Sequence, residues 1–271
     1  MKLGYTIWEW GLENEEDLKK AMQDMKDLGC HYFENFIGMA DMYMGREEEF
    51  NQLVKQYDLE FIALYHYIND LTIDNVAEAE KYIEFCKKTG AAVMNIQAPD
   101  RHGDPSEEEL GELARQLNGI GKLAYENGIT LCLHPHFQMM VEKEKEIDYM
   151  AEHMDEKYVK FCFDTAHTVL GEMKNSALLR KYGSRIGYIH FKDQDLNVDV
   201  NEYRRLWIEE WDQHQRFFEL GTKSVDFKEV LQVLKEVGYD GYVVIENDTP
   251  TVGNFEGAKH NIEYCRNVLN L

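Results

Sequence analysis

Six ionisable residues stand at the ends of four apolar runs in the second half of the chain. They are His134 and His136 in LCLHPHF, Asp164 and His167 in FCFDTAH, His190 in IGYIHFKD, and Glu246 in YVVIEND. A polar side chain is tolerable at the tip of a barrel strand and costly deeper in it, so such runs are typical of strand tips that build an active site. Imidazoles and carboxylates that converge from several strands form the ligand set of a divalent metal. The pattern therefore predicts a metal site.

Each of these residues also has a structural interpretation. Asp164 could be the N-cap of a helix that begins after it. A histidine between apolar residues, such as His190, is more often a hydrogen-bonded core residue than a ligand, and Glu246 alone could be a solvated acid. Explanations of this kind cover one residue each and leave the repetition of the pattern unexplained. The proline between His134 and His136 removes a ladder donor, so the strand should end there with both imidazoles in reach of the site.

Weaker candidates for contact with a substrate lie mainly in the first half of the chain. They are Trp8, Glu34, His66 and Arg101. Trp8, together with aromatic residues such as Tyr65, could wall a sugar-binding pocket or only pack. Lys192, two residues after His190, could polarise a substrate oxygen or neutralise nearby acids.

The elements that must position these residues alternate regularly. Apolar runs occur at 3–8, 30–35, 59–66, 91–98, 129–134, 159–164, 186–191 and 242–247, with helical patterns between them and glycines where the helices should end. Such strand–helix units, without a linker, predict an α/β fold in which residues 1–271 form a single (β/α)8 barrel. A doubly wound sheet is the alternative, but it would usually carry a Gly-rich phosphate loop, and neither GxGxxG nor GxxxxGK occurs.

Residues 193–224 are too many for an ordinary connection between a strand and a helix. This segment carries Trp207, Trp211, Phe217 and Phe218. We therefore expect an ordered flap over the C-terminal mouth of the barrel, and its aromatic residues also offer an interface for a homo-oligomer.

The composition excludes several classes of partner. A net charge of −22, from 51 acidic and 29 basic residues, argues against nucleic acid and against an anionic membrane surface. The five cysteines form no CxxC pair, which fits a reducing cytoplasm. No apolar h-region and no stretch of about 18 apolar residues occurs, so we expect a cytoplasmic protein without a membrane segment.

With these motifs in place, the whole chain resembles the xylose isomerase-like barrel superfamily of sugar isomerases and epimerases. The most specific parts are FCFDTAH, IGYIHFKD, FELGTKSVDF and GYDGYVVIEN. The resemblance implies one divalent metal ion (Mn²⁺, Mg²⁺, Co²⁺ or Zn²⁺) at the C-terminal mouth, bound by Asp164, His190 and Glu246. It also implies that His167 binds substrate or supports the ligands, and that Lys192 matches a lysine often found after the seventh strand.

One position departs from the common pattern. Most members end the fifth strand with Glu, in a motif like LEPH, whereas LHPH places His134 there. In epimerases of this superfamily, glutamates on strands five and eight exchange the proton of the substrate carbon, and only Glu246 remains here. The LHPH segment resembles the inosose dehydratase branch, which has a His-rich fifth-strand motif. His134 could therefore bind the metal, act as acid or base, or do neither.

The enzymes that the chain resembles share one first step, the removal of a proton next to a carbonyl with a metal-stabilised enediolate. Glu246 could be the base, and His134 and His136 offer an acid near neutral pH. Superfamily frequency favours an isomerase or epimerase of a small sugar or keto-polyol, and LHPH favours a keto-polyol dehydratase as the alternative. A non-catalytic sugar-binding barrel and a DNA-repair endonuclease are the remaining hypotheses, and the charge argues against the latter.

Overall fold

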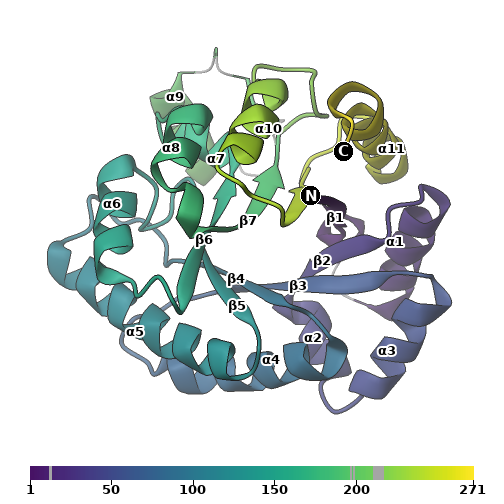
Figure 1. The fold of residues 1–271 in the computed structure, drawn as a ribbon, viewed down its shortest axis with the longest axis horizontal. Coiled ribbons are helices and arrows are strands. Elements are labelled where there is room, and N and C mark those ends of the chain that lie inside the picture. Colours follow the sequence, from purple (N-terminus) through teal and green to yellow (C-terminus); the bar gives the residue numbers. More distant parts are fainter. Residues whose placement is uncertain (12–13, 196, 198, 210–216) are drawn as a thin grey trace.

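Eight parallel strands close into a barrel in chain order, and helices surround it in the computed structural model (Figure 1). The structure describes residues 1–11, 14–195, 197, 199–209 and 217–271. The strands are β1 (Lys2–Thr6), β2 (Tyr32–Phe36), β3 (Glu60–Tyr67), β4 (Val93–Gln97), β5 (Thr130–His134), β6 (Val159–Asp164), β7 (Ile186–Phe191) and β8 (Tyr242–Ile245). The predicted single (β/α)8 barrel is confirmed, and each predicted apolar run overlaps one strand.

Helices cover the outside of the barrel. They are α1 (Glu15–Asp27), α2 (Ile37–Tyr43), α3 (Glu47–Gln56), α4 (Asn75–Thr89), α5 (Glu107–Glu126), α6 (Glu144–His153), α7 (Thr165–Leu170), α8 (Asn175–Lys181), α9 (Val200–Glu209), α10 (Phe227–Glu236) and α11 (Asn254–Tyr264), with the short turns η1 (Trp8–Trp10), η2 (Gly183–Arg185) and η3 (Cys265–Leu269). Helix α4 ends as predicted at Gly90, whose φ of 85° suits glycine. The sequence did not indicate α2 or α9, whereas α7 begins directly after Asp164, as an N-cap at that residue requires.

The interior of the barrel is filled by apolar side chains below the mouth. Apolar side chains that point inward from the strands form one cluster, which comprises Ile62, Ala63, Val93, Cys132, Cys162, Tyr188 and Val244. The opposite faces of the strands pack against the helices in a larger cluster. Polar residues at the C-terminal ends of the strands therefore lie above a closed apolar floor, as in other barrels of this type.

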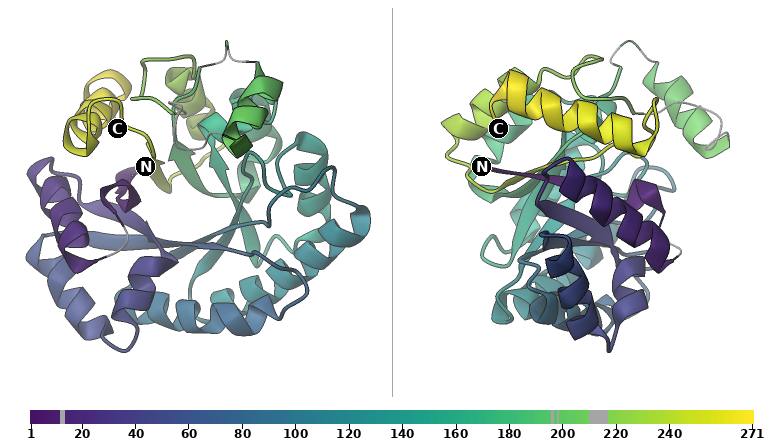
Figure 2. Two further views of the ribbon diagram at one scale, coloured as in Figure 1. Left: turned by 180° about the vertical axis from the view of Figure 1, so that it is seen from behind. Right: turned by 90° about the vertical axis from the view of Figure 1, so that its right-hand side faces the viewer.

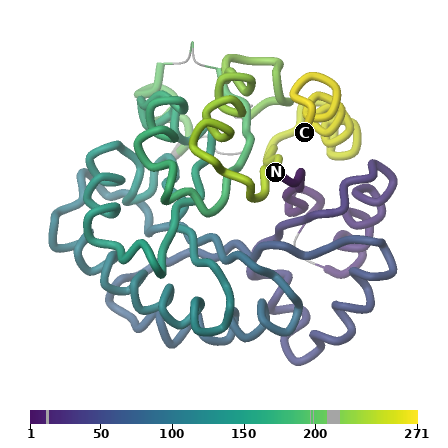
Figure 3. Tube along the Cα trace, in the orientation of Figure 1, coloured from purple at the N-terminus to yellow at the C-terminus, as the bar shows by residue number. Residues whose placement is uncertain are grey.

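Helix α9 belongs to the long segment 193–224 and stands at the end of the barrel away from the N-terminus (Figure 2). Its Tyr203 and Trp207 lie against Phe137, with ring centroids 5.7 and 5.4 Å apart. Part of the predicted flap, namely residues 196, 198 and 210–216 with Trp211, lies outside the described residues. The two chain ends lie near each other in every view (Figure 3). No helix among the described residues is long and apolar enough to cross a membrane.

Candidate metal centre and imidazole cluster

Asp164, His190 and Glu246 meet at the C-terminal ends of β6, β7 and β8, and one ligand atom from each lies within 4.8 Å of the others. All three side chains are buried, yet Asp164 Oδ2, His190 Nδ1 and Glu246 Oε2 have no hydrogen-bond partner. His190 Nδ1 and Glu246 Oε2 lie 2.7 Å apart without the alignment of a hydrogen bond. Unpaired buried polar atoms are costly, and a mixed nitrogen and oxygen set suits a divalent cation. These residues therefore fit one divalent metal ion.

Asp164 is the N-cap that one interpretation of the sequence suggested, and its second oxygen remains available for a metal ion. Its Oδ1 accepts hydrogen bonds from the backbone N–H groups of Ala166 and His167, at 2.7 and 2.8 Å, and so caps α7. Its Oδ2 stays free and faces the other two ligands. Burial raises the pKa of Asp164 to about 7, so a cation at this place would favour the ionised carboxylate.

His190 is held from below by Glu34, which the sequence suggested as a substrate contact. Glu34 is fully buried, and its Oε2 lies 2.7 Å from His190 Nε2. Its Oε1 accepts a hydrogen bond from Asn95 Nδ2 at 2.7 Å. Burial alone would lower the pKa of His190, but Cys162, Glu34 and Glu246 together raise it well above its usual value. The structure thus places the buried carboxylate of Glu34 against the imidazole of His190.

Lys192 is fully buried and ion-paired with two carboxylates. Its Nζ lies 2.5 Å from Glu246 Oε1, 2.6 Å from Asp248 Oδ2 and 3.9 Å from the centre of the Phe217 ring. Burial opposes the charge, but Asp248 and Glu246 raise the pKa of Lys192 well above its usual value. Burial also opposes ionisation of Glu246, yet Lys192 and His190 hold the pKa of that carboxyl well below its usual range. Both groups are therefore charged at neutral pH.

Asp248 and Asn95 were not identified from the sequence. Asp248 follows Glu246 by two residues in IEND, and that proximity was the available signal. Asn95 is a fully buried polar residue inside the apolar run AAVMNIQA, a position that polar residues occupy only with a partner.

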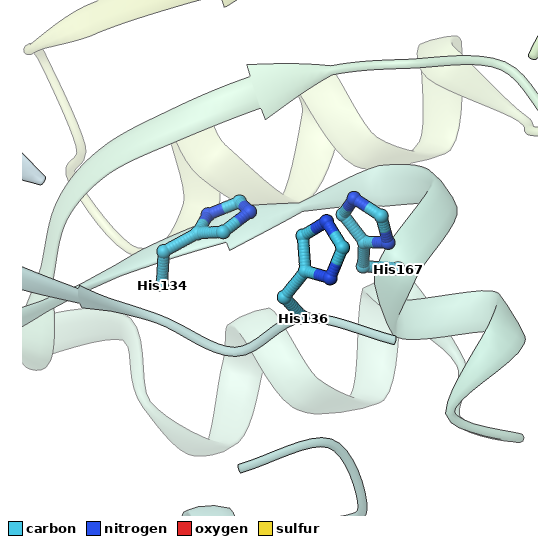
Figure 4. Close-up of side chains that lie close together, drawn as sticks. All are labelled: His134, His136 and His167. Carbon is cyan, nitrogen blue, oxygen red and sulfur yellow. The ribbon is translucent and has the colours of Figure 1, made fainter. Parts of the chain in front are cut away.

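His134, His136 and His167 form a second group beside the ligands, and their rings point toward one another (Figure 4). His134 Nδ1 lies 3.2 Å from the carbonyl oxygen of Cys162, and His136 Nδ1 lies 2.6 Å from that of Phe137. A carbonyl oxygen only accepts, so in both rings Nδ1 carries the proton and Nε2 offers a lone pair. His134 Nε2 is buried without a hydrogen-bond partner.

His167 has the opposite tautomer. Lys192 Nζ lies 3.5 Å from its Nε2 and only donates, so the proton of His167 sits on Nδ1, a buried atom without a hydrogen-bond partner. Burial lowers the pKa of His136 to about 3 and those of His134 and His167 well below their usual value. This imidazole cluster (His134, His136 and His167) is therefore neutral and offers two acceptors and one donor. The ammonium of Lys192 beside it disfavours a second cation there.

An aromatic wall of Trp8, Phe36 and Tyr65 closes the other side of the mouth. The Trp8 ring lies 4.4 Å from Phe36 and 5.6 Å from Tyr65, measured between centroids. Tyr65 also lies 5.4 Å from His134, so the wall reaches the imidazole cluster. Trp8 Nε1 donates to Asp248 Oδ1 at 2.8 Å, which fixes the indole. Trp8 thus packs with Tyr65, as its neighbourhood in the predicted wall requires, and Phe36 was not identified from the sequence.

Two predicted substrate contacts lie elsewhere. His66 packs against Tyr82 of α4, with ring centroids 4.9 Å apart, because alternation along β3 turns Tyr65 to the mouth and His66 to the helices. Arg101 is held by ion pairs with Glu146 and Asp104, at 2.7 and 2.8 Å. In the described part of the chain, neither side chain contacts the metal ligands or the imidazole cluster.

Comparison with known proteins places this chain in a family. A relative from Klebsiella pneumoniae strain 342, named inosose dehydratase, is 31% identical over 196 residues, which cover 69% of this chain and 65% of that protein. A relative of the same name from Clostridium beijerinckii is 30% identical and is matched over 92% of its length and 90% of this chain. The solved structure of the IolI protein with a bound zinc atom has a TM-score of 0.80 at 17% identity, covering 100% of this chain and 98% of that one. The family model described as "xylose isomerase-like TIM barrel" matches residues 22–268, and the chain belongs to that family.

Proposed function

We propose that this enzyme is a divalent-metal-dependent lyase that dehydrates a neutral keto-polyol. The observation that carries the proposal is the imidazole cluster. The fifth strand ends in His134, whose bare Nε2 is buried next to His136 and His167, where epimerases of the superfamily carry a second glutamate. Relatives named inosose dehydratase support the same reaction, although the chain spans 65% of the length of the first of them.

Asp164, His190 and Glu246 would hold the metal ion, of the class Mn²⁺, Mg²⁺, Co²⁺ or Zn²⁺. A bound divalent cation would polarise the substrate carbonyl and so acidify the neighbouring C–H. Glu246 is engaged on both oxygens, because Oε1 pairs with Lys192 and Oε2 faces the other ligands. A carboxylate engaged on both oxygens suits a ligand better than a base.

His134 would remove the proton. Its Nε2 accepts the proton from the carbon next to the carbonyl. The electrons of that C–H bond then form a carbon–carbon double bond while the bond between the β carbon and its hydroxyl oxygen breaks. The same proton passes to the leaving hydroxyl group, which departs as water. His136 lies where it can relay this proton, and the Nδ1–H of His167 can donate a hydrogen bond to the leaving oxygen. Lys192 keeps the neighbouring carboxylates neutralised.

The mouth suits an uncharged substrate. Among the described residues, the cation next to the metal ligands is Lys192, and Glu246 and Asp248 already neutralise it. A phosphate group would need further Lys or Arg donors. The aromatic wall instead offers an apolar surface to the C–H face of a polyol.

An isomerase or epimerase of a small sugar or keto-polyol, the first hypothesis from the sequence, is the second candidate. It is favoured by Glu246, since a carboxylate kept ionised by Lys192 could exchange a proton with carbon if one oxygen left the ligand set. In that reaction the carbon is reprotonated and no water is lost.

Turnover in deuterated water separates the candidates. The full chain with Mn²⁺ is incubated with unphosphorylated keto-inositols and ketohexoses, and the products are analysed by mass spectrometry and NMR. The lyase gives a product that has lost one water. Deuterium bound to carbon without loss of water would refute the lyase and support the isomerase. A chain that binds no metal and turns over nothing would instead be a sugar-binding barrel.

A further inference from the structure

We propose that Glu34 is a positioning residue that fixes the tautomer of His190 and thereby sets the affinity of the metal site. This inference rests on the proposed metal centre. Glu34 Oε2 accepts from His190 Nε2 at 2.7 Å, so the proton of the neutral ring stays on Nε2. The lone pair of Nδ1 then faces Glu246 Oε2 and the ligand group.

The surroundings of Glu34 keep its carboxylate in this role. Its Oε1 is occupied by the Nδ2 donor of Asn95, and none of its side chain is exposed. The pairing register of β2 with β3 shifts between Phe33 and Glu34, and such bulges re-aim the side chain that follows. Glu34 therefore lies against the His190 ring with both carboxylate oxygens occupied.

A carboxylate is the chemically suitable partner for a metal-binding imidazole. It accepts the N–H opposite the ligand nitrogen, orients the ring and raises the basicity of the ligand atom. If Glu34 served packing alone, its buried charge would only destabilise the fold, because a buried ion pair can usually be replaced by apolar residues with little loss of stability.

The substitution Glu34→Gln tests the tautomer directly. With Nδ2 of Asn95 directed at residue 34 as in the wild type, this donor selects the amide oxygen of the new Gln and turns the NH₂ group toward His190. That donor forces the proton of His190 onto Nδ1, where it blocks the ligand lone pair. We expect the affinity for Co²⁺, measured by competition with a chelating dye, to fall about 10–100-fold. The absorption spectrum of the bound Co²⁺ should change as well.

A second variant separates tautomer control from damage to the fold. In Glu34→Gln/Asn95→Leu the donor at residue 95 is gone, so the amide can turn its oxygen toward His190 and should recover most of the lost affinity. Glu219→Gln is the matched control, because Glu219 is a buried acid that accepts from Thr251, outside the ligand group, and its loss should leave Co²⁺ affinity unchanged.

The outcomes are distinct. Wild-type affinity in Glu34→Gln, or an equal loss in the double variant, would overturn the role of Glu34. In ¹⁵N NMR of the Zn²⁺-loaded wild type, a proton on Nε2 of the zinc-bound imidazole supports the inference and a proton on Nδ1 overturns it. If the wild-type chain binds neither Co²⁺ nor Zn²⁺, the proposed function itself fails.

Discussion

The backbone carbonyl of Cys162 accepts a hydrogen bond from Nδ1 of His134, at 3.2 Å, and this contact determines which nitrogen of the ring faces the substrate space. It leaves Nε2 without a proton and without a partner. The bond joins the end of β5 to β6, so the same pairing that builds the barrel orients the proposed base.

The substitution His134→Gln should separate a base from a ligand. If His134 is the base, turnover falls about 10²–10⁴-fold while the chain keeps its metal. Turnover and bound metal are measured on the same preparation, with the exposed His153→Gln as control. A loss of metal as complete as in Asp164→Ala would instead make His134 a fourth ligand.

Alanine at Asp164, His190 or Glu246 should abolish metal retention, because each removes a ligand atom that has no other partner. Elemental analysis of the wild type should give one divalent ion per chain, since the ammonium of Lys192 lies 3.5 Å from His167 in the imidazole cluster. Saturating metal should stabilise the fold by about 2.7 kcal/mol at a hundred times its Kd. Metal retained in all three variants would show that the site lies elsewhere.

Lys192→Met should destabilise the metal-free chain by about 3–5 kcal/mol, because the carboxylates of Glu246 and Asp248 lose the buried cation between them. Added Mn²⁺ should recover part of this loss by supplying positive charge nearby. Urea unfolding with and without Mn²⁺ measures both effects. Lys223→Met is the control, since Lys223 also lies over an aromatic ring, that of Phe218, but is one third exposed. Equal losses in the two variants would contradict the role assigned to Lys192.

Much of this architecture could be predicted from the sequence because strands and strand tips leave local signals. The apolar run before Glu246 indicated both the strand and the place where it ends. The same holds for Asp164 and His190, so the ligand group could be anticipated from residues that are far apart in the chain.

The features of the site that could not be predicted depend on the direction in which each side chain points. Tyr65 and His66 are neighbours, and only the register of the closed barrel decides which of them faces the mouth. Glu34 was identified as a polar residue on a strand, but its burial beneath His190 follows from a bulge that has no sequence signal. Likewise, the tautomers of the imidazole cluster depend on carbonyls and an ammonium contributed by other segments.

His66 makes a further prediction about stability against pH. Burial, with a smaller contribution from Lys81, lowers the pKa of His66 from 6.5 to about 4. The folded state then binds fewer protons than the unfolded state between these values, so the free energy of unfolding falls as the pH drops through this range. His66→Phe keeps an aromatic ring against Tyr82. Between about pH 7 and pH 4.5, the free energy of unfolding of this variant should fall by about 2 kcal/mol less than that of the wild type. Urea unfolding at both pH values measures the difference, and the exposed His31→Phe should behave as wild type. An identical pH dependence in wild type and His66→Phe would show that His66 is not the group responsible.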